Sequence, residues 1–100
     1  MLDLTLKEIA QIAGGQLNKP EYEDIHVDVV SIDTRTISAG EMYMPILGEK
    51  LDGHIFIDMA FEKDAVASFC NIKRRKDFDD YPLVLVEDTN AAFTKLAKNF

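Results

Sequence analysis

The first hydrophobic pattern along the chain has the period of a helix. Apolar side chains recur three to four positions apart over residues 6–13, which predicts an amphipathic helix there. Thr5 and Glu8 have the three-residue spacing of a capping box at the start of this helix. Gly14 and Gly15 follow the last apolar position and supply a left-handed stop. Local signals therefore bound this helix at both ends.

Two later segments carry the same period. Residues 54–63 are apolar on one side and acidic on the other, so we expect a second amphipathic helix with Asp52 as its N-cap. A last helix is expected to be capped by Thr89 and to continue through residues 92–97. Because no Gly or Pro closes this helix before Phe100, we expect the chain to be a piece of a longer protein.

Four short apolar runs predict strands, at residues 26–32, 42–47, 65–70 and 83–86. Pro45 lies inside the second run, and because proline has no N–H to donate, it indicates a strand edge or a bulge at that point. Strands that alternate with helices predict an α/β fold, in which a small mixed or mainly parallel sheet is flanked by helices.

Size and charge narrow the range of functions. A chain of 100 residues makes one domain. Such a domain buries roughly 60–70% of its unfolded surface, so we expect a functional site on an edge or loop and not in a deep cavity. Eleven Lys and Arg against eighteen Asp and Glu give a net charge of −7, which argues against a nucleic-acid partner. No apolar run approaches the ~18 residues of a membrane span, so no membrane partner is expected.

Several reactive or charged residues have an ordinary structural interpretation. Cys70 is the single cysteine, which fits a small core residue in a cytoplasmic protein. Three aspartates follow the basic run at residues 73–76, so residues 73–80 predict a self-compensating surface loop. His26 is interpreted as an exposed structural histidine. The chain has no catalytic-triad arrangement, zinc-ligand spacing or phosphate-binding glycine motif, so neither a catalytic residue nor a metal ligand is predicted.

Candidate binding chemistry lies in two loops that each follow an apolar strand. Ligands bind at the carboxyl ends of strands in open α/β sheets, and residues 33–35 lie at one such end. Thr34 offers a donor to a ligand carbonyl there. The alternative is that Asp33 and Arg35 only form a local ion pair.

The second loop, residues 48–54, has the composition of a phosphate or nucleotide site. Its two glycines let backbone N–H groups approach a ligand, Lys50 adds a mobile cation, and a helix N-terminus follows. The alternative is that the glycines are turn residues, Lys50 is solvated and His54 is a polar residue in the first helical turn. The spacing alone does not decide between the two.

Four sequence blocks, taken together, resemble the N-terminal domain of the Mur ligase family. They are residues 33–35, 39–43, 48–54 and 86–97, and their order and spacing agree over roughly the whole chain. The last two blocks are more similar to the ligases that add D-alanyl-D-alanine to UDP-N-acetylmuramoyl-tripeptide than to those that add the third stem-peptide residue. The resemblance implies that residues 1–100 are a single UDP-substrate-binding domain, a fragment without the central ATP-binding and C-terminal domains.

The resemblance also implies a set of binding residues. In the family, a domain of this kind holds the uridine end of the UDP-muramoyl-peptide. Carried over by position, the two loops line that pocket, while the end of the second loop mainly shapes the turn. The implied substrate-binding residues are Thr34, Arg35, Gly48, Glu49, Lys50, Leu51, Asp52 and His54.

For the full-length protein, the resemblance implies a cytoplasmic, ATP-dependent amide ligase of peptidoglycan synthesis. ATP and Mg²⁺ would be its cofactors, bound by a central domain of the same chain and not by this fragment, which is expected to be inactive alone. Two alternatives remain open: a ligase that adds the third stem-peptide residue, or a non-catalytic interaction or regulatory module of the same fold.

Overall fold

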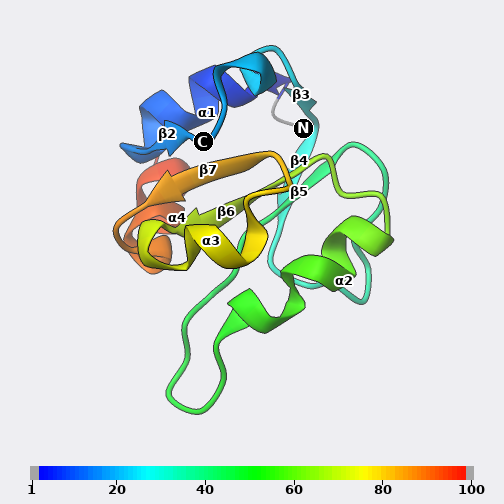
Figure 1. Ribbon diagram of the computed structural model, residues 1–100, viewed down its shortest axis with the longest axis vertical. Helices are drawn as coiled ribbons and strands as arrows, with labels where there is room; N and C mark the ends of the chain where they lie inside the picture. The colour runs from blue at the N-terminus through cyan, green and yellow to red at the C-terminus, as the bar shows by residue number, and fades with distance from the viewer. Residues whose placement is uncertain (1–2, 99–100) are drawn as a thin grey trace.

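A central sheet organises the molecule, whose computed structural model describes residues 3–98. Its strands are β2 (Gln16–Leu17), β4 (Val29–Ser31), β5 (Glu41–Tyr43), β6 (Ala67–Asn71) and β7 (Leu83–Val86). In the described residues their order is β2-β7-β6-β5-β4, with β4 to β7 mutually parallel and β2 antiparallel at the edge (Figure 1). This confirms the predicted α/β fold with a mixed, mainly parallel sheet.

Helices cover both faces of the sheet. The helical elements are α1 (Leu6–Ala13), η1 (Pro20–Tyr22), η2 (Gly53–Phe56), α2 (Ile57–Glu62), η3 (Ile72–Arg74), α3 (Arg75–Phe78) and α4 (Thr89–Ala97). Helices α1 and α4 share one buried cluster with the sheet, and α2 and α3 share a second cluster with its other face. Separately, β1 (Leu4–Thr5) pairs antiparallel with β3 (His26–Val27).

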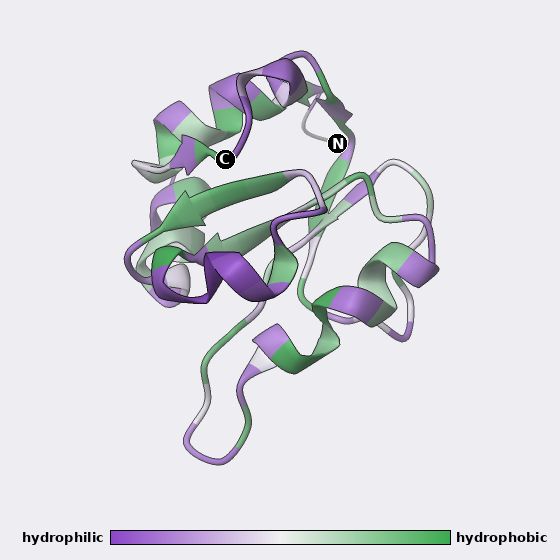
Figure 2. Ribbon diagram, in the orientation of Figure 1, coloured by the Kyte–Doolittle hydropathy of each residue, from purple (hydrophilic) through white to green (hydrophobic). Residues whose placement is uncertain are grey.

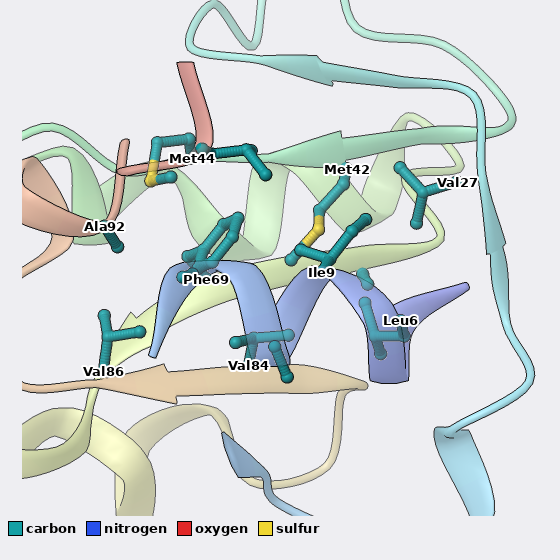
Figure 3. Close-up of a cluster of buried hydrophobic side chains, with 13 residues drawn as sticks. Leu6, Ile9, Val27, Met42, Met44, Phe69, Val84, Val86 and Ala92 are labelled. Atoms are coloured by element: carbon teal, nitrogen blue, oxygen red, sulfur yellow. The ribbon is translucent and has the colours of Figure 1, made fainter. Parts of the chain in front are cut away.

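Alternation along the strands divides the core between these two faces. Successive strand residues point to opposite sides of a sheet, so Met42 packs in the cluster with α1 while Tyr43 packs in the cluster with α2. Phe69 and Cys70 divide in the same way, and Cys70 is fully buried as expected. Figure 3 shows Met42 and Phe69 facing Ile9 of α1. Strand β7 is hydrophobic along its length, whereas the helices are striped (Figure 2), as expected when a sheet is covered on both faces.

Helix α1 has the predicted bounds. Thr5 Oγ1 accepts a hydrogen bond from the Glu8 N–H at 3.3 Å, and the Glu8 carboxylate accepts one from the Thr5 N–H at 3.0 Å. Gly14 ends the helix at φ 73° in the left-handed region. Gly15 lies so close to β7 that an added Cβ would be 2.6 Å from the Leu85 carbonyl oxygen.

Two strand predictions were wrong in their extent. The expected strand 26–32 is divided into β3 and β4, because its two halves pair with different neighbours, β1 and β5. The expected strand 42–47 ends at Tyr43. Met44 N–H still donates to Ser31 O at 2.9 Å, but Pro45 has no N–H with which to extend the ladder. The chain therefore leaves the sheet two residues after β5.

Two predictions about local structure were wrong in kind. Residues 73–80, expected as a surface loop, mostly form η3 and α3, because Phe78 is buried in the core and a salt bridge from Arg75 to Asp79 spans one turn. The cap of α4 is Asp88, not Thr89. The Asp88 carboxylate accepts from the N–H groups of the second and third helical residues, and Thr89 is the first residue of the helix.

Candidate functional site

The loop at residues 48–51 projects from the carboxyl end of β5, away from the body of the molecule (Figure 1). All four of its residues are exposed. Leu47 and Asp52 face each other at its base in an antiparallel bridge, and the Gly48 N–H donates to Leu51 O at 2.8 Å. The loop is thus a tight, hairpin-like turn. We call residues 48–51 the tip loop.

Gly53 fixes the outgoing side of the tip loop. Its N–H donates to Ile46 O at 3.0 Å, and a Cβ at this position would meet the Ile46 nitrogen at 2.7 Å. The buried Tyr43 hydroxyl donates to Gly53 O at 2.9 Å. Burial, followed by the nearby Asp52 and Asp33 carboxylates, raises the pKa of Tyr43 to about 12. Tyr43 therefore stays a neutral donor over the physiological pH range and holds the backbone of Gly53.

His54 lies beneath the tip loop and is only 3% exposed. Its Nε2 accepts a hydrogen bond from the Asn71 N–H at 2.9 Å, so the ring proton is on Nδ1, which donates to Asp52 Oδ1 at 2.7 Å. The Asp52 carboxylate also accepts from the His54 N–H at 2.9 Å, which confirms Asp52 as the N-cap of the turn that follows. Both ring nitrogens of His54 are therefore used inside the protein.

Arg74 completes this arrangement from the segment after β6. Its guanidinium donates to Asp52 Oδ2 at 2.8 Å. Desolvation raises the pKa of Asp52, but the hydrogen bonds from the backbone and ring of His54, with the charge of Arg74, outweigh it and leave that pKa below its usual value. Asp52 is therefore held as a carboxylate by contacts from two other elements.

The incoming side of the tip loop is held by α4. The Asn90 side-chain Oδ1 accepts from the Leu47 N–H at 3.0 Å, and its Nδ2 donates to Leu47 O at 3.0 Å. These two bonds satisfy the donor and the acceptor of one residue, as a neighbouring strand would. Asn90, at the N-terminal end of α4, thus supplies backbone hydrogen bonds to the chain after Pro45, where pairing with a neighbouring strand has ended.

The first predicted loop has a different environment. Asp33 and Arg35 form a two-point ion pair, with an Arg35 Nη2 to Asp33 Oδ2 distance of 2.9 Å, and this pairing holds the pKa of Asp33 below its usual value. The local ion pair, which was the alternative interpretation of these residues, is thus present. Thr34 is buried, at 7% exposure, and its hydroxyl has no hydrogen-bond partner within residues 3–98.

The structure brings together some of the predicted site residues and separates others. Asp52 and His54 are in direct contact, while Glu49, Lys50 and Leu51 are exposed beside them. In the described part of the chain, no hydrogen bond or ion pair joins residues 33–35 to the tip loop. The two loops follow adjacent parallel strands. Besides burial, the carboxylates of Asp52, at the base of the tip loop, and of Asp33, in the first loop, both contribute to the raised pKa of Tyr43.

A cavity of about 450 Å³ lies beside the base of the tip loop. Its walls come from the end of β6 and from the segments that follow β5, β6 and β7, and include Asp52, His54, Asn71, Arg74 and Asn90. Sequence motifs did not point to Asn71, Arg74 or Asn90. The signal that finds them is topological: Asn71 ends β6, Arg74 lies just after β6, and Asn90 lies shortly after β7. All three are therefore at the same carboxyl end of the parallel strands as the segment that follows β5.

Two kinds of feature are absent from residues 3–98. No group of three or more His, Cys, Asp or Glu side chains is placed to hold a metal ion. No helix in this part of the chain is long and apolar enough to cross a membrane.

Comparison with known proteins decides the family. The model of the Mur ligase family, catalytic domain, matches residues 26–100. The chain belongs to the Mur ligase family. The UDP-N-acetylmuramoyl-tripeptide–D-alanyl-D-alanine ligase of Bacillus subtilis is 33% identical over 100 residues, which is all of this chain and 22% of that protein. Its counterpart from Escherichia coli is 35% identical over 97 residues, covering 97% of this chain and 20% of that protein.

Other Mur ligases are also similar to this chain. The UDP-N-acetylmuramoyl-L-alanyl-D-glutamate–2,6-diaminopimelate ligase of Oceanobacillus iheyensis is 32% identical over 80 residues, 80% of this chain and 16% of that protein. A crystal structure of MurF from Acinetobacter baumannii has the same fold, with a TM-score of 0.80 and 19% identity over 93% of this chain and 20% of that one. The chain spans about a fifth of the length of the D-alanyl-D-alanine ligases that it matches.

Proposed function

We propose that this chain binds the uridine-diphosphate end of UDP-N-acetylmuramoyl-tripeptide, as the substrate-binding domain of a ligase that adds D-alanyl-D-alanine in peptidoglycan precursor synthesis. The observation that carries the proposal is an exposed loop on a fixed base, in a chain whose D-alanyl-D-alanine ligase relatives are similar over nearly its full length. Both relatives are named for a UDP-N-acetylmuramoyl substrate.

The tip loop offers donors suited to a nucleotide. Within the described residues, the N–H groups of Glu49, Lys50 and Leu51 have no internal acceptor, since the turn is closed by Gly48. Free N–H groups on a rigid turn match the carbonyl oxygens of a uracil ring. The Lys50 ammonium adds a positive charge for the diphosphate. Arg35 and Thr34, at the neighbouring strand end, are the second group of proposed contacts.

His54 and Asp52 take a supporting part in this proposal. Both nitrogens of the buried His54 ring are occupied, and Asp52 is shared between His54 and Arg74. Their contacts fix the direction of the chain where it leaves the tip loop. We therefore assign them to shaping the loop, with direct ligand contact carried by its exposed residues.

ATP and Mg²⁺ would act in other parts of the full-length protein. Within residues 3–98, no group of three or more His, Cys, Asp or Glu side chains is placed to hold a metal ion. We propose a cytoplasmic protein in which a central ATP-binding domain of the same chain activates the substrate that this domain holds.

A titration of the 100-residue chain with UDP-N-acetylmuramoyl-tripeptide tests the proposal. We expect the amide signals of Gly48, Lys50 and Thr34 to shift in ¹H–¹⁵N NMR spectra, with UMP shifting a subset of them. N-acetylmuramoyl-tripeptide without the nucleotide is the matched control and should leave the tip loop unmoved. Unchanged tip-loop signals at millimolar UDP-linked ligand would refute the proposal.

A second candidate rests on the diaminopimelate ligases among the relatives. The Oceanobacillus iheyensis protein is similar over 80 residues, and a second such ligase, from Bacteroides thetaiotaomicron, is 32% identical over 76 residues. Both are named for a UDP-N-acetylmuramoyl substrate with a shorter peptide. Under this alternative the uridine contacts would be the same, so the two functions differ in the peptide of the UDP-linked substrate and in the acceptor that the full-length protein uses.

A further inference from the structure

Asn90 makes an unusual connection between α4 and the tip loop. It is the second residue of α4, where its backbone N–H donates to the capping carboxylate of Asp88 at 2.9 Å. Its side chain takes no part in that cap. Instead, both polar atoms of the side chain bond to the backbone of Leu47, 43 positions earlier in the chain.

The helix does not need this side chain for its own formation. Asp88 already satisfies two of the first N–H groups of α4, and the Asn90 carbonyl accepts from the Thr94 hydroxyl at 3.2 Å. The side-chain bonds of Asn90 therefore act on Leu47, the residue that leads into the tip loop. Leu47 is 55% exposed, so its own packing does not hold it in place.

We propose that Asn90 is a positioning residue that keeps the tip loop in its substrate-binding conformation; this inference rests on the proposed function. The outgoing side of the loop is already fixed by Gly53, Asp52 and the bonds to them from Tyr43 and Arg74. The incoming side is held by Asn90. A loop fixed on both sides loses less conformational freedom when it binds a ligand, so its affinity is higher for the same contacts.

The test compares wild-type protein with Asn90→Ala, Asn90→Asp and a control, Thr94→Ala. Thr94 is an exposed polar residue of the same helix whose hydroxyl bonds to the α4 backbone. Asn90→Asp keeps an acceptor for the Leu47 N–H and removes the donor to Leu47 O. Three quantities are measured for each protein: hydrogen exchange of the Leu47 amide, the Kd for UDP-N-acetylmuramoyl-tripeptide, and the thermal unfolding midpoint.

We expect Asn90→Ala to speed exchange of the Leu47 amide and to raise the Kd about fivefold, with Asn90→Asp between it and wild type. Thr94→Ala should leave both quantities unchanged. Because a merely structural role would act through global stability, the Kd of Asn90→Ala should rise at a temperature where it remains fully folded. An unchanged Leu47 exchange rate, or faster exchange with an unchanged Kd, overturns the positioning role.

The two proposals fail in different ways. If the wild-type chain does not bind the UDP-linked peptide, the proposed function fails, and the ligand-free measurements alone judge Asn90. In that case faster exchange of Leu47, with increased backbone motion confined to residues 48–51, supports its hold on the loop. Exchange and motion equal to wild type overturn it.

Discussion

Gly53 shows at a single residue how closely the backbone of the site is packed. Its neighbours are backbone atoms of Ile46 and Pro45, which a new methyl group cannot push aside without moving the chain. At Gly48, by comparison, an added Cβ would lie 3.3 Å from the Leu51 oxygen. The two glycines therefore differ in their surroundings. Gly53 is packed closely against backbone atoms, whereas Gly48 lies in an exposed turn with more space around it.

We therefore predict that Gly53→Ala lowers the free energy of unfolding by about 1–3 kcal/mol, because the overpacked backbone must shift. Gly48→Ala is the matched control and should cost less than about 0.5 kcal/mol. Urea denaturation of both variants measures the difference. Equal stabilities of the two variants would contradict the packing argument.

Lys50 gives the residue-scale test of charge in the tip loop. Lys50→Ala removes an exposed cation beside the proposed diphosphate position, so we expect the Kd for UDP-N-acetylmuramoyl-tripeptide to rise about two- to fivefold at low salt. Lys7→Ala makes the same change in net charge on the exposed face of α1 and should leave the Kd unaltered. Isothermal titration of both variants decides whether the effect is local. A similar loss in both would mean that only net charge matters.

The Asp52 carboxylate predicts a pH dependence of stability. Its pKa is lower in the folded protein than in the unfolded chain, so its contribution is present above the unfolded pKa and is lost as the pH falls through the folded pKa. Asp52→Asn keeps the shape but removes this charge. The difference in unfolding free energy between wild type and variant should therefore be largest above roughly pH 5 and shrink toward pH 3. A difference that is constant over this range would contradict the prediction.

At the scale of the elements, helix caps show what local sequence reasoning can and cannot settle. Helix α1 could be predicted to the residue because its cap and its stop are made by neighbours in the chain. For α4, both Asp88 and Thr89 are good capping types, and the choice depends on the extended backbone of Asp88 at the end of β7. That backbone is set by the sheet, so the sequence pattern alone placed the cap one residue late.

The assignment of that cap can be tested with two variants. Asp88→Ala leaves the N–H groups of Asn90 and Ala91 without their acceptor and should lower the free energy of unfolding by about 1 kcal/mol. Valine is nearly the same size as threonine, and Thr89→Val removes a hydroxyl with no hydrogen-bond partner in the described residues. Its effect on the free energy of unfolding should therefore be close to zero. Thermal unfolding followed by circular dichroism ranks the two. A larger loss of stability for Thr89→Val than for Asp88→Ala would mean that Thr89 is the N-cap.

Strand extents were harder to predict than helix extents because strand pairing is not local. A run of β-branched residues indicates an extended backbone but not the strand with which it pairs. The sequence pattern therefore could not show that residues 26–32 divide into two strands, one paired with β1 and the other with β5. The same reason applies to residues 73–80. Their charges indicate an exposed surface, and the single apolar Phe78 was too weak a signal to predict the helix that buries it.

At the scale of the whole molecule, the sheet order explains which parts of the site could be found in advance. The tip loop could be predicted because Gly48, Lys50, Gly53 and the following helix are adjacent in sequence. Asn71 at the end of β6, Arg74 after β6 and Asn90 after β7 bond to residues on either side of that loop. They meet there only because β5, β6 and β7 lie in consecutive places in the sheet. No local motif records such a contact.

The acceptor, which is the amino compound that the full-length ligase joins to the UDP-linked peptide, can be predicted at the scale of the whole molecule. This domain is proposed to hold the UDP end of the substrate, and both classes of relative are named for a UDP-linked substrate. The acceptor must therefore be determined with the full-length protein. With ATP and Mg²⁺, we expect the full-length protein to form ADP and phosphate in the presence of UDP-N-acetylmuramoyl-tripeptide and D-alanyl-D-alanine, measured by phosphate release and mass spectrometry of the product. UDP-N-acetylmuramoyl-L-alanyl-D-glutamate with diaminopimelate is the matched alternative pair. Turnover of that second pair alone would assign the chain to the diaminopimelate ligases while leaving the role of the tip loop intact.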